Sequence, residues 1–280
     1  MDQPFITPAV TADALSERLV VDCRFSLDEP GRGAVDYLRA HVPGAVYAHL
    51  DHDLADTSLR GQGRHPLPTA AAFAARLAGW GWRAGRAVIV YDDGDAPLAA
   101  ARLWWMLRIA GVDAQVMNGG WRAWQAAGLP TESGPAQRHS QAPAALSFDA
   151  AATVGYEALE DPRKRRALLL LDARATPRFR GVREPRDPVA GHVPGAQNRP
   201  MSMNLDDRGR FKPAAALRAE FDALLGPRRP ADVVHMCGSG VSACQNQLAM
   251  ELAGLHGSRV FVPSWSGWCS DPRRPVATGA

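Results

Sequence analysis

The chain has 280 residues, which suggests about two domains. Its 32 Lys and Arg nearly balance its 29 Asp and Glu, so the net charge of +3 argues against a nucleic-acid partner. Residues 1–10 lack the basic start and apolar core of a signal peptide, and no apolar run approaches the roughly 20 residues that span a bilayer. We therefore expect no membrane association. The 4 scattered cysteines fit a reducing cytoplasm.

Two short motifs occur twice, in the same order, at a spacing of about 150 residues. The run Val20–Arg24 (VVDCR) recurs as Leu170–Arg174 (LLDAR). The run His41–Ala45 (HVPGA) recurs without change as His192–Ala196. Two matches in the same order indicate a duplicated domain.

A third pair of segments shows how the two copies differ. The apolar runs at 88–92 (VIVYD) and 233–237 (VVHMC) both predict a buried strand. The first ends in Asp92 and the second in Cys237. Because a carboxylate cannot replace a nucleophilic thiol, we expect the N-terminal copy to be catalytically inactive.

Each half alternates short apolar runs with helical patterns, which is typical of a parallel sheet flanked by helices. In the first half a helix is predicted over 98–109, followed by a strand at 115–117 and a glycine turn at 118–121 that opens another helix. In the second half, residues 260–268 occupy the place that matches this strand and turn. Residues 131–149 separate the two halves and include a stretch rich in Pro, Gly, Ser, Gln and Ala, so we place a linker there. The predicted domains are therefore residues 1–130 and 150–280.

The most informative residue is Cys237, which follows a strand pattern and precedes Gly238 and Gly240. Glycines let successive backbone N–H groups point at one atom, and the helix predicted from Ser242 adds its positive end. Both effects favour the thiolate, the reactive form of cysteine. Cys237 is therefore a candidate nucleophile. The alternative is an inert buried cysteine, which would not explain the paired glycines.

Two further groups of residues carry weaker signals. Cys244 lies about two helical turns beyond Cys237, which leaves open a packed position or a resolving thiol. His49, Asp51, His52 and Asp53 are metal-ligand types, but their spacing fits no zinc site, and we predict no metal.

The run Cys237–Ala243 (CGSGVSA) closely resembles the active-site loop CGSGVTA of 3-mercaptopyruvate sulfurtransferases. Together with the duplication, it identifies the chain as similar to the two-domain sulfurtransferases of the rhodanese superfamily. The resemblance implies an α/β protein of two tandem rhodanese-like domains, each a parallel five-stranded sheet flanked by helices. It also implies that the nucleophile lies in the second domain and that catalysis needs neither a metal nor an organic cofactor.

The resemblance also suggests which residues hold the substrate. Residues 178–187 resemble the family's RFRG…EPRD stretch, whose first and last arginines hold the substrate's carboxylate and carbonyl. These match Arg178 and Arg186, with a connection one residue shorter than in the family. The alternative for both is a surface arginine in an exposed ion pair. Within the loop, the expected substrate-binding residues are Gly238, Gly240, Val241 and Ser242.

In the family, the loop serine works in a relay with a histidine of the first domain and an acidic residue. Carried over by position, these are Ser239 and His41, with Asp36 as a candidate for the acid. The alternative for His41 is a structural histidine that hydrogen-bonds its own turn, because the same residue recurs as His192.

The activity implied is transfer of sulfur from 3-mercaptopyruvate to a thiol such as thioredoxin, or to cyanide, through a Cys237 persulfide with release of pyruvate. Thiosulfate:cyanide sulfurtransfer is the alternative, but the family members that use this dianion carry basic residues where this chain has Gly238 and Ser239. A non-catalytic module that carries sulfur or binds a partner is a further alternative. A phosphatase of this fold would need an arginine where Ala243 stands.

Overall fold

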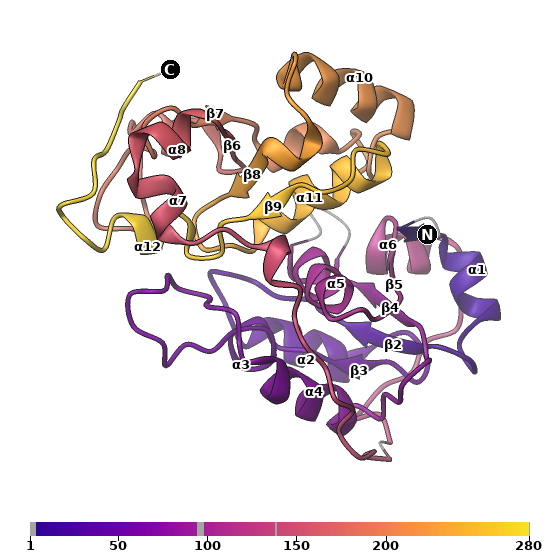
Figure 1. Cartoon of the computed structure of the whole chain (residues 1–280). Helices are drawn as coiled ribbons and strands as arrows, with labels where there is room; N and C mark the ends of the chain where they lie inside the picture. Colours follow the sequence, from indigo (N-terminus) through magenta and orange to yellow (C-terminus); the bar gives the residue numbers. More distant parts are fainter. Residues whose placement is uncertain (1–3, 94–97, 138, 280) are drawn as a thin grey trace. The chain divides into compact units, whose positions relative to one another are not determined.

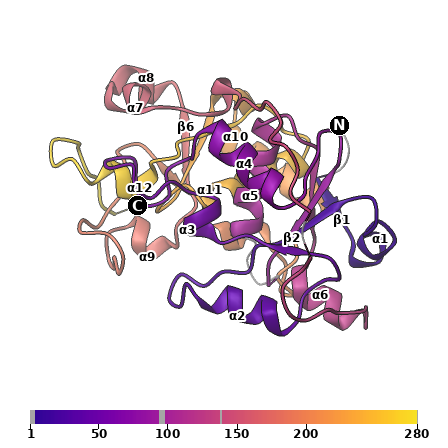
Figure 2. The same cartoon turned by 90° about the horizontal axis from the view of Figure 1, so that it is seen from below.

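The computed structural model describes residues 4–93, 98–137 and 139–279 (Figures 1 and 2). Its contacts divide the chain into two units. Unit 1 comprises residues 1–56, 67–149 and 207–211, and unit 2 comprises residues 57–66, 150–206 and 212–280. Apart from two short segments, unit 1 covers the chain up to residue 149 and unit 2 covers the chain from residue 150. Residues 57–66 group with unit 2, and residues 207–211 group with unit 1.

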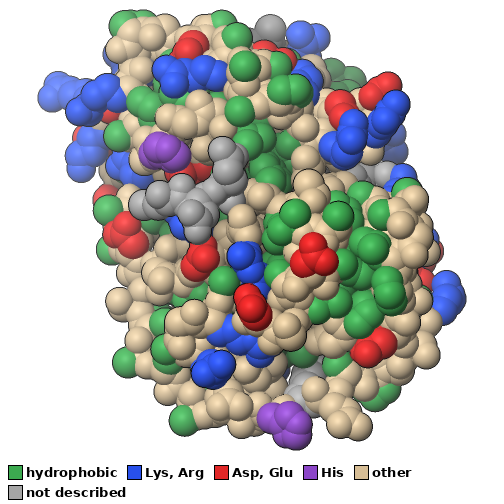
Figure 3. Space-filling model, turned by 90° about the vertical axis from the view of Figure 1, so that its right-hand side faces the viewer, with side chains coloured by type: hydrophobic (Ala, Val, Ile, Leu, Met, Phe, Trp, Pro, Cys, Tyr) green, Lys and Arg blue, Asp and Glu red, His purple; other side chains and the backbone are tan. Residues whose placement is uncertain are grey.

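The surface carries charges of both signs. On the face in Figure 3, basic and acidic side chains are interspersed, in keeping with the small net charge. None of the helices in the described part of the chain is long and apolar enough to cross a membrane.

Unit 1 is built on a parallel sheet of five strands in the order β1-β5-β4-β2-β3. Strands β2 and β4, which lie inside the sheet, are buried along their whole length, as expected for apolar runs inside a parallel sheet. The five-stranded sheet predicted for the first half is confirmed. Its strands are β1 (Phe5–Ile6), β2 (Leu19–Asp22), β3 (Val46–Tyr47), β4 (Val88–Tyr91) and β5 (Ala114–Met117).

Helices flank this sheet. Helix α5 packs against β4 and β5, and α1 lies beside α6 (Figures 1 and 2). Trp121 and Trp124 of α6 belong to a core cluster with Ile89 and Tyr91 of β4. The predicted glycine turn before α6 is present, with Gly119 at φ +87°. The helices are α1 (Pro8–Asp13), α2 (Arg32–Arg39), α3 (Leu50–Asp53), α4 (Ala70–Gly79), α5 (Ala99–Ile109) and α6 (Gly120–Ala126).

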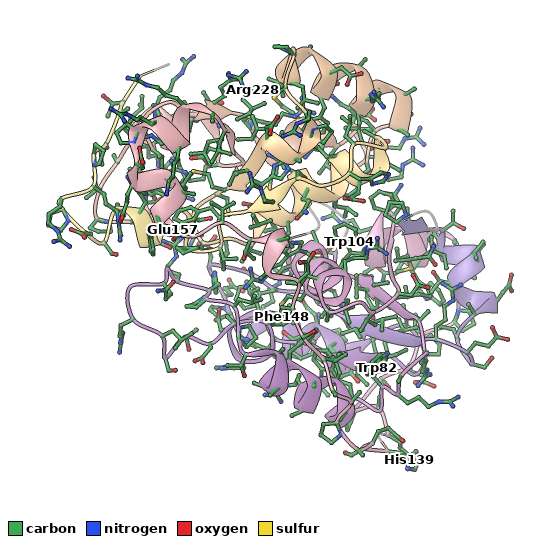
Figure 4. The ribbon with its side chains drawn as sticks, viewed as in Figure 1. Trp82, Trp104, His139, Phe148, Glu157 and Arg228 are labelled. Atoms are coloured by element: carbon green, nitrogen blue, oxygen red, sulfur yellow. The ribbon has the colours of Figure 1, made fainter. Side chains whose placement is uncertain are left out.

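The predicted linker runs along unit 1. Its backbone donates hydrogen bonds from Gly134 to the carbonyl of Leu38 and from Gln141 to that of Ala78, at 2.8 and 3.0 Å. Near its end, Phe148 packs on Phe73 of α4 with ring centroids 5.7 Å apart (Figure 4). These contacts explain how a segment without apolar periodicity has a defined path.

Unit 2 contains a parallel sheet of four strands in the order β7-β6-β8-β9, rather than the five predicted. The position of the fifth strand, next to β9, is held by a single parallel bridge between Thr153 and Val260. One bridge does not extend far enough to form a strand, so this edge of the sheet is shorter than in unit 1. The strands are β6 (Leu169–Asp172), β7 (Gln197–Asn198), β8 (Val233–Met236) and β9 (Arg259–Val260).

A core cluster joins this sheet to α7 and α12. Val234 and Met236 of β8 pack there with Trp265 and Trp268 of α12. Helix α11 packs against β8 and α10. The helices are α7 (Tyr156–Glu160), α8 (Pro162–Arg166), α9 (Thr176–Phe179), α10 (Ala214–Leu225), α11 (Ser242–Leu252) and α12 (Ser264–Trp268), with one-turn 3-10 helices at Ala150–Ala152, Met201–Asn204 and Pro230–Asp232.

The repeated motifs make the same contacts in both units. Asp22 accepts hydrogen bonds from the backbone and side chain of Arg24, and Asp172 accepts the equivalent bonds from Arg174. In each unit the arginine also donates to a carbonyl just before the HVPGA motif, that of Ala40 or of Gly191. This pair closes the turn after the strand, so its presence in both copies has a structural cause.

Candidate functional site

The candidate nucleophile lies where β8 ends and before α11 begins. Cys237 is 1% exposed, and its Sγ accepts a hydrogen bond from the backbone N–H of Gly240 at 3.2 Å. Gly240 has φ +78°, and a Cβ there would lie 2.3 Å from the carbonyl oxygen of Val262. Only glycine fits this position, for conformational and steric reasons. The loop is therefore shaped so that a backbone donor reaches the sulfur.

The segment after β9 supports the loop. The Oγ of Ser264 accepts a hydrogen bond from the backbone N–H of Cys237 at 3.1 Å and donates to the carbonyl of Phe261 at 2.9 Å. The N–H groups of Trp265 and Ser266 donate to the carbonyls of Cys237 and Gly238, both at 2.9 Å. This segment lies within residues 260–268, which are expected to match the strand and turn of the first half, but its support of the loop is not predicted from the sequence. Ser264 has φ +52°, which a single sequence does not reveal.

Two arginines approach the loop beside the nucleophile. A Cβ on Gly238 would lie 3.0 Å from Nη2 of Arg64 and 3.3 Å from Nη1 of Arg178. Arg178 is the predicted substrate-binding arginine. Arg64 was not predicted, and it comes from the segment 57–66 that groups with unit 2. Two guanidinium groups next to a cysteine can hold an anionic group by charge-assisted hydrogen bonds.

Acidic side chains hold both guanidinium groups in place. Glu184 accepts from Nε and Nη2 of Arg178, with the shortest bond 2.6 Å, and Arg174 reaches the same carboxylate at 3.3 Å. Asp187 accepts from Nη2 of Arg178 at 3.0 Å and from Nη1 of Arg64. The site is therefore preorganised before any ligand arrives.

The pKa values of these two carboxyl groups move in opposite directions. Burial acts to raise the pKa of Glu184, but hydrogen bonds from Arg178 and from the backbone of Arg186 and Asp187 lower it below its usual value. Burial raises the pKa of Asp187, against the lowering effect of Arg64. Glu184 is thus the more firmly anionic of the two.

Ser239 hydrogen-bonds a histidine, but not the one predicted. Its Oγ lies 2.7 Å from Nδ1 of His65, and both side chains are buried. His65 precedes Pro66 in a segment without a helical or strand pattern, so its sequence offers no signal for this role. Its partner is 174 residues away along the chain.

His41 lies in unit 1 and has other partners. Its Nδ1 is 2.8 Å from the carbonyl oxygen of Tyr37, and its ring stacks on that tyrosine at 4.1 Å. His192 makes the matching contacts with Phe179, at 2.8 and 3.8 Å. The same contacts in both copies support the alternative interpretation of His41 as a structural histidine. Its role in the relay stays a prediction without a supporting contact.

The remaining predicted residues divide into two groups. Gly238, Val241 and Ser242 form the loop and the start of α11 around Cys237. Arg186 is exposed, and its backbone N–H donates to Glu184 at 3.0 Å. Arg64 is thus a second arginine whose guanidinium group lies next to Gly238, with that of Arg178.

The two weaker signals in the sequence were Cys244 and a group of metal-ligand residue types. The Sγ of Cys244 is buried and donates to the carbonyl of Gly240 at 3.4 Å, which is a packed position behind the loop. The described residues contain no group of three or more His, Cys, Asp or Glu side chains arranged to hold a metal ion.

A carboxylate occupies the position in unit 1 that matches the nucleophile of unit 2. Asp92 follows β4 as Cys237 follows β8, and its carbonyl accepts from Trp121 at 2.7 Å as that of Cys237 accepts from Trp265. The Oδ2 of Asp92 accepts from the backbone N–H groups of Leu98 and Ala100 at 2.9 and 3.4 Å. The chain's own carboxylate thus takes donors at the start of α5.

We expect Asp92→Ala to leave sulfur transfer within about twofold of the wild type, because the residue stands where the second copy has its nucleophilic thiol and carries no thiol itself. The free energy of unfolding should fall by about 1–3 kcal/mol, since buried N–H groups lose their acceptor. Steady-state kinetics and urea unfolding measure the two effects. A hundredfold loss of turnover in a folded variant would show that this loop takes part in catalysis.

With this geometry established, comparison with known families identifies the fold. A family model described as a rhodanese-like domain matches residues 7–127 and 156–271. The chain belongs to the rhodanese-like family and contains two copies of its domain.

Three similar proteins indicate which class of rhodanese-like protein the chain resembles. The chain is 45% identical to a Pseudomonas aeruginosa protein named probable 3-mercaptopyruvate sulfurtransferase, over 96% of this chain and 98% of the relative. It is 39% identical to the putative thiosulfate sulfurtransferase SseB of Mycobacterium tuberculosis, over 93% and 90%. The structure of 3-mercaptopyruvate sulfurtransferase from Leishmania major superposes with a TM-score of 0.86 at 31% identity, over 98% of this chain and 75% of that one. The predicted two-domain sulfurtransferase is confirmed.

Proposed function

We propose that this enzyme takes sulfur from 3-mercaptopyruvate, holds it as a persulfide on Cys237, releases pyruvate and passes the sulfur to a thiol. The observation that supports the proposal is a buried cysteine sulfur that accepts a hydrogen bond from the Gly240 N–H, with the guanidinium groups of Arg64 and Arg178 next to the adjoining Gly238. A nucleophile next to a carboxylate-binding pair suits a small donor that carries both sulfur and a carboxylate.

In the first step, the Cys237 thiolate attacks the donor's sulfur. A new S–S bond forms, the donor's C–S bond breaks, and its electron pair leaves as the enolate of pyruvate, which then takes a proton. The donor's sulfur remains on Cys237 as the outer atom of the persulfide. The Gly240 N–H stabilises negative charge on the sulfur before and after this step.

Arg64 and Arg178 hold the donor's carboxylate, which sets the distance between its sulfur and Cys237. The Ser239 hydroxyl polarises the donor's carbonyl, where negative charge develops as the enolate leaves. His65, 2.7 Å from Ser239, exchanges the proton with this hydroxyl. In this scheme His65 takes the role predicted for His41, and Arg64 the role predicted for Arg186.

In the second step, an acceptor attacks the outer sulfur and the Cys237 thiolate leaves. We propose a thiol such as that of reduced thioredoxin as the acceptor, with cyanide as a small-molecule substitute that yields thiocyanate. All four cysteines are free and buried, and this use of cysteine supports our proposal of a cytoplasmic location.

The second candidate function is transfer from thiosulfate through the same persulfide. Its support is the similarity to the Mycobacterium tuberculosis relative named for thiosulfate. Against it, the loop offers no basic side chain at positions 238 and 239, and each nearby guanidinium group is already paired with a carboxylate. The site therefore offers little unpaired positive charge to balance the two negative charges of thiosulfate.

We expect the wild-type enzyme to prefer 3-mercaptopyruvate over thiosulfate in kcat/KM by at least about tenfold, which corresponds to about 1.4 kcal/mol in transition-state stabilisation. Initial rates with each donor and one common thiol acceptor measure this ratio. Equal or better use of thiosulfate would make the second candidate the function. No turnover with either donor would favour a sulfur-carrier module.

A further inference from the structure

We propose that Asp187 is a specificity-determining residue that makes the donor site select a monoanion over a dianion. The inference rests on the proposed function, in which Arg64 and Arg178 hold the donor's anionic group. It concerns the carboxylate that lies between these two arginines.

Asp187 contacts both arginines with different oxygens. Its Oδ1 accepts from Nη1 of Arg64, and its Oδ2 accepts from Nη2 of Arg178 at 3.0 Å. The side chain is 3% exposed, so water screens these contacts little. The guanidinium nitrogens nearest a Cβ placed on Gly238 are Nη2 of Arg64 at 3.0 Å and both Nη1 and Nη2 of Arg178, at 3.3 and 3.4 Å. Asp187 therefore binds Nη1 of Arg64 and leaves its Nη2 toward the loop, whereas Nη2 of Arg178 both binds Asp187 and lies next to the loop.

The ion pairs that Arg64, Arg174 and Arg178 form are balanced in charge. Arg64 pairs with Asp187, Arg178 with Glu184 and Asp187, and Arg174 with Asp172 and Glu184. Three guanidinium groups thus face three carboxylates: Arg64, Arg174 and Arg178 against Asp172, Glu184 and Asp187. A donor therefore meets arginines whose positive charges are already paired with these three carboxylates.

The negative charge of Asp187 affects the binding of the two donors to different extents. 3-Mercaptopyruvate brings one carboxylate, whereas thiosulfate brings two negative charges. Repulsion from the Asp187 carboxylate scales with the donor's charge, so it acts about twice as strongly on the dianion. Glu184 has a different role, because it also binds Arg174 and two backbone N–H groups and so holds the segment's shape.

Asp187→Asn tests the inference because it removes the charge and keeps the size. We expect the ratio of kcat/KM for 3-mercaptopyruvate to that for thiosulfate to fall by about tenfold or more, through a lower KM for thiosulfate. Both donors are measured at one fixed ionic strength with the same acceptor, and thermal unfolding checks that the variant is folded. Asp222→Asn is the matched control, since it removes a carboxylate from an exposed pair with Arg218 on α10.

A purely structural role for Asp187 would lower both rates together and leave the ratio unchanged, which would overturn the inference. If Asp187→Asn does not fold, Asp187→Ser provides the same charge change with a smaller side chain, and the same fall in the ratio is expected. Asp187→Glu keeps the charge, so its ratio should stay close to that of the wild type. The wild-type ratio tests the proposed function separately, because the change caused by Asp187→Asn is measured whichever donor the wild type prefers.

Discussion

Cys237→Ser should abolish sulfur transfer, with turnover reduced by at least about a thousandfold, because a hydroxyl at this position cannot become a persulfide. The substitution removes one sulfur atom and keeps the loop, since the Gly240 N–H can donate to a serine oxygen as it does to Sγ. The expected loss is therefore chemical, and thermal unfolding should be close to that of the wild type. Steady-state rates with 3-mercaptopyruvate and a thiol acceptor measure the effect.

The other cysteines provide matched controls. Cys244→Ser and Cys269→Ser should keep most of the activity, because Cys244 packs behind the loop on the Gly240 carbonyl and Cys269 lies in the core cluster near α12. Wild-type enzyme treated with donor alone should gain the mass of one sulfur atom, and dithiothreitol should remove it. Activity that survives in Cys237→Ser, or no gain in mass, would contradict the persulfide mechanism.

Arg178→Gln should lower kcat/KM for 3-mercaptopyruvate by about a hundredfold. The loss of a charge-assisted contact between the substrate's carboxylate and a guanidinium group that is 19% exposed costs on the order of 2–4 kcal/mol. Glutamine keeps a donor for Glu184, whose carboxylate otherwise loses a partner in a buried position. Thiosulfate has no carboxylate to place, so its reaction should fall less. Kinetics with both donors separate the two effects.

Arg180 provides the control for this substitution. It lies two residues further along the chain and is exposed, so Arg180→Gln makes the same change of charge away from the Gly238 loop. Its kcat/KM should stay within about twofold of the wild type for both donors. If Arg178→Gln affected the donors equally, or no more than Arg180→Gln does, Arg178 would not be the residue that holds the substrate's carboxylate.

The elements that could be predicted are those whose signals are local in the chain. The apolar runs that became β4 and β8 are short and continuous, because strands at the centre of a parallel sheet are buried on both faces. The duplicated HVPGA motif showed that one fold occurs twice. Cys237 was found because a strand, two glycines and a helix start follow one another within about ten residues, and the chemistry of the loop is built from that short segment.

The edge strand of the second sheet is a feature that local sequence patterns could not predict correctly. A parallel sheet gains an edge strand only if a separate segment reaches it over enough residues to pair. In unit 2 that segment makes one bridge, Thr153 to Val260, whereas in unit 1 β1 pairs with β5. The pairing depends on the path of the backbone, which no pattern in residues 150–155 encodes.

The partners of the loop were decided by tertiary structure alone. Arg64 and His65 come from a segment without periodicity, yet they reach Asp187 and Ser239, which are 123 and 174 residues away along the chain. Two neighbouring residues also differ in their surroundings. Asp187 contacts Arg64 and Arg178, whereas the side chain of Arg186 is exposed. Local patterns along the chain are therefore enough to predict the duplicated fold and the nucleophile. The groups that surround the nucleophile depend on where distant segments meet, and only the folded chain brings them together.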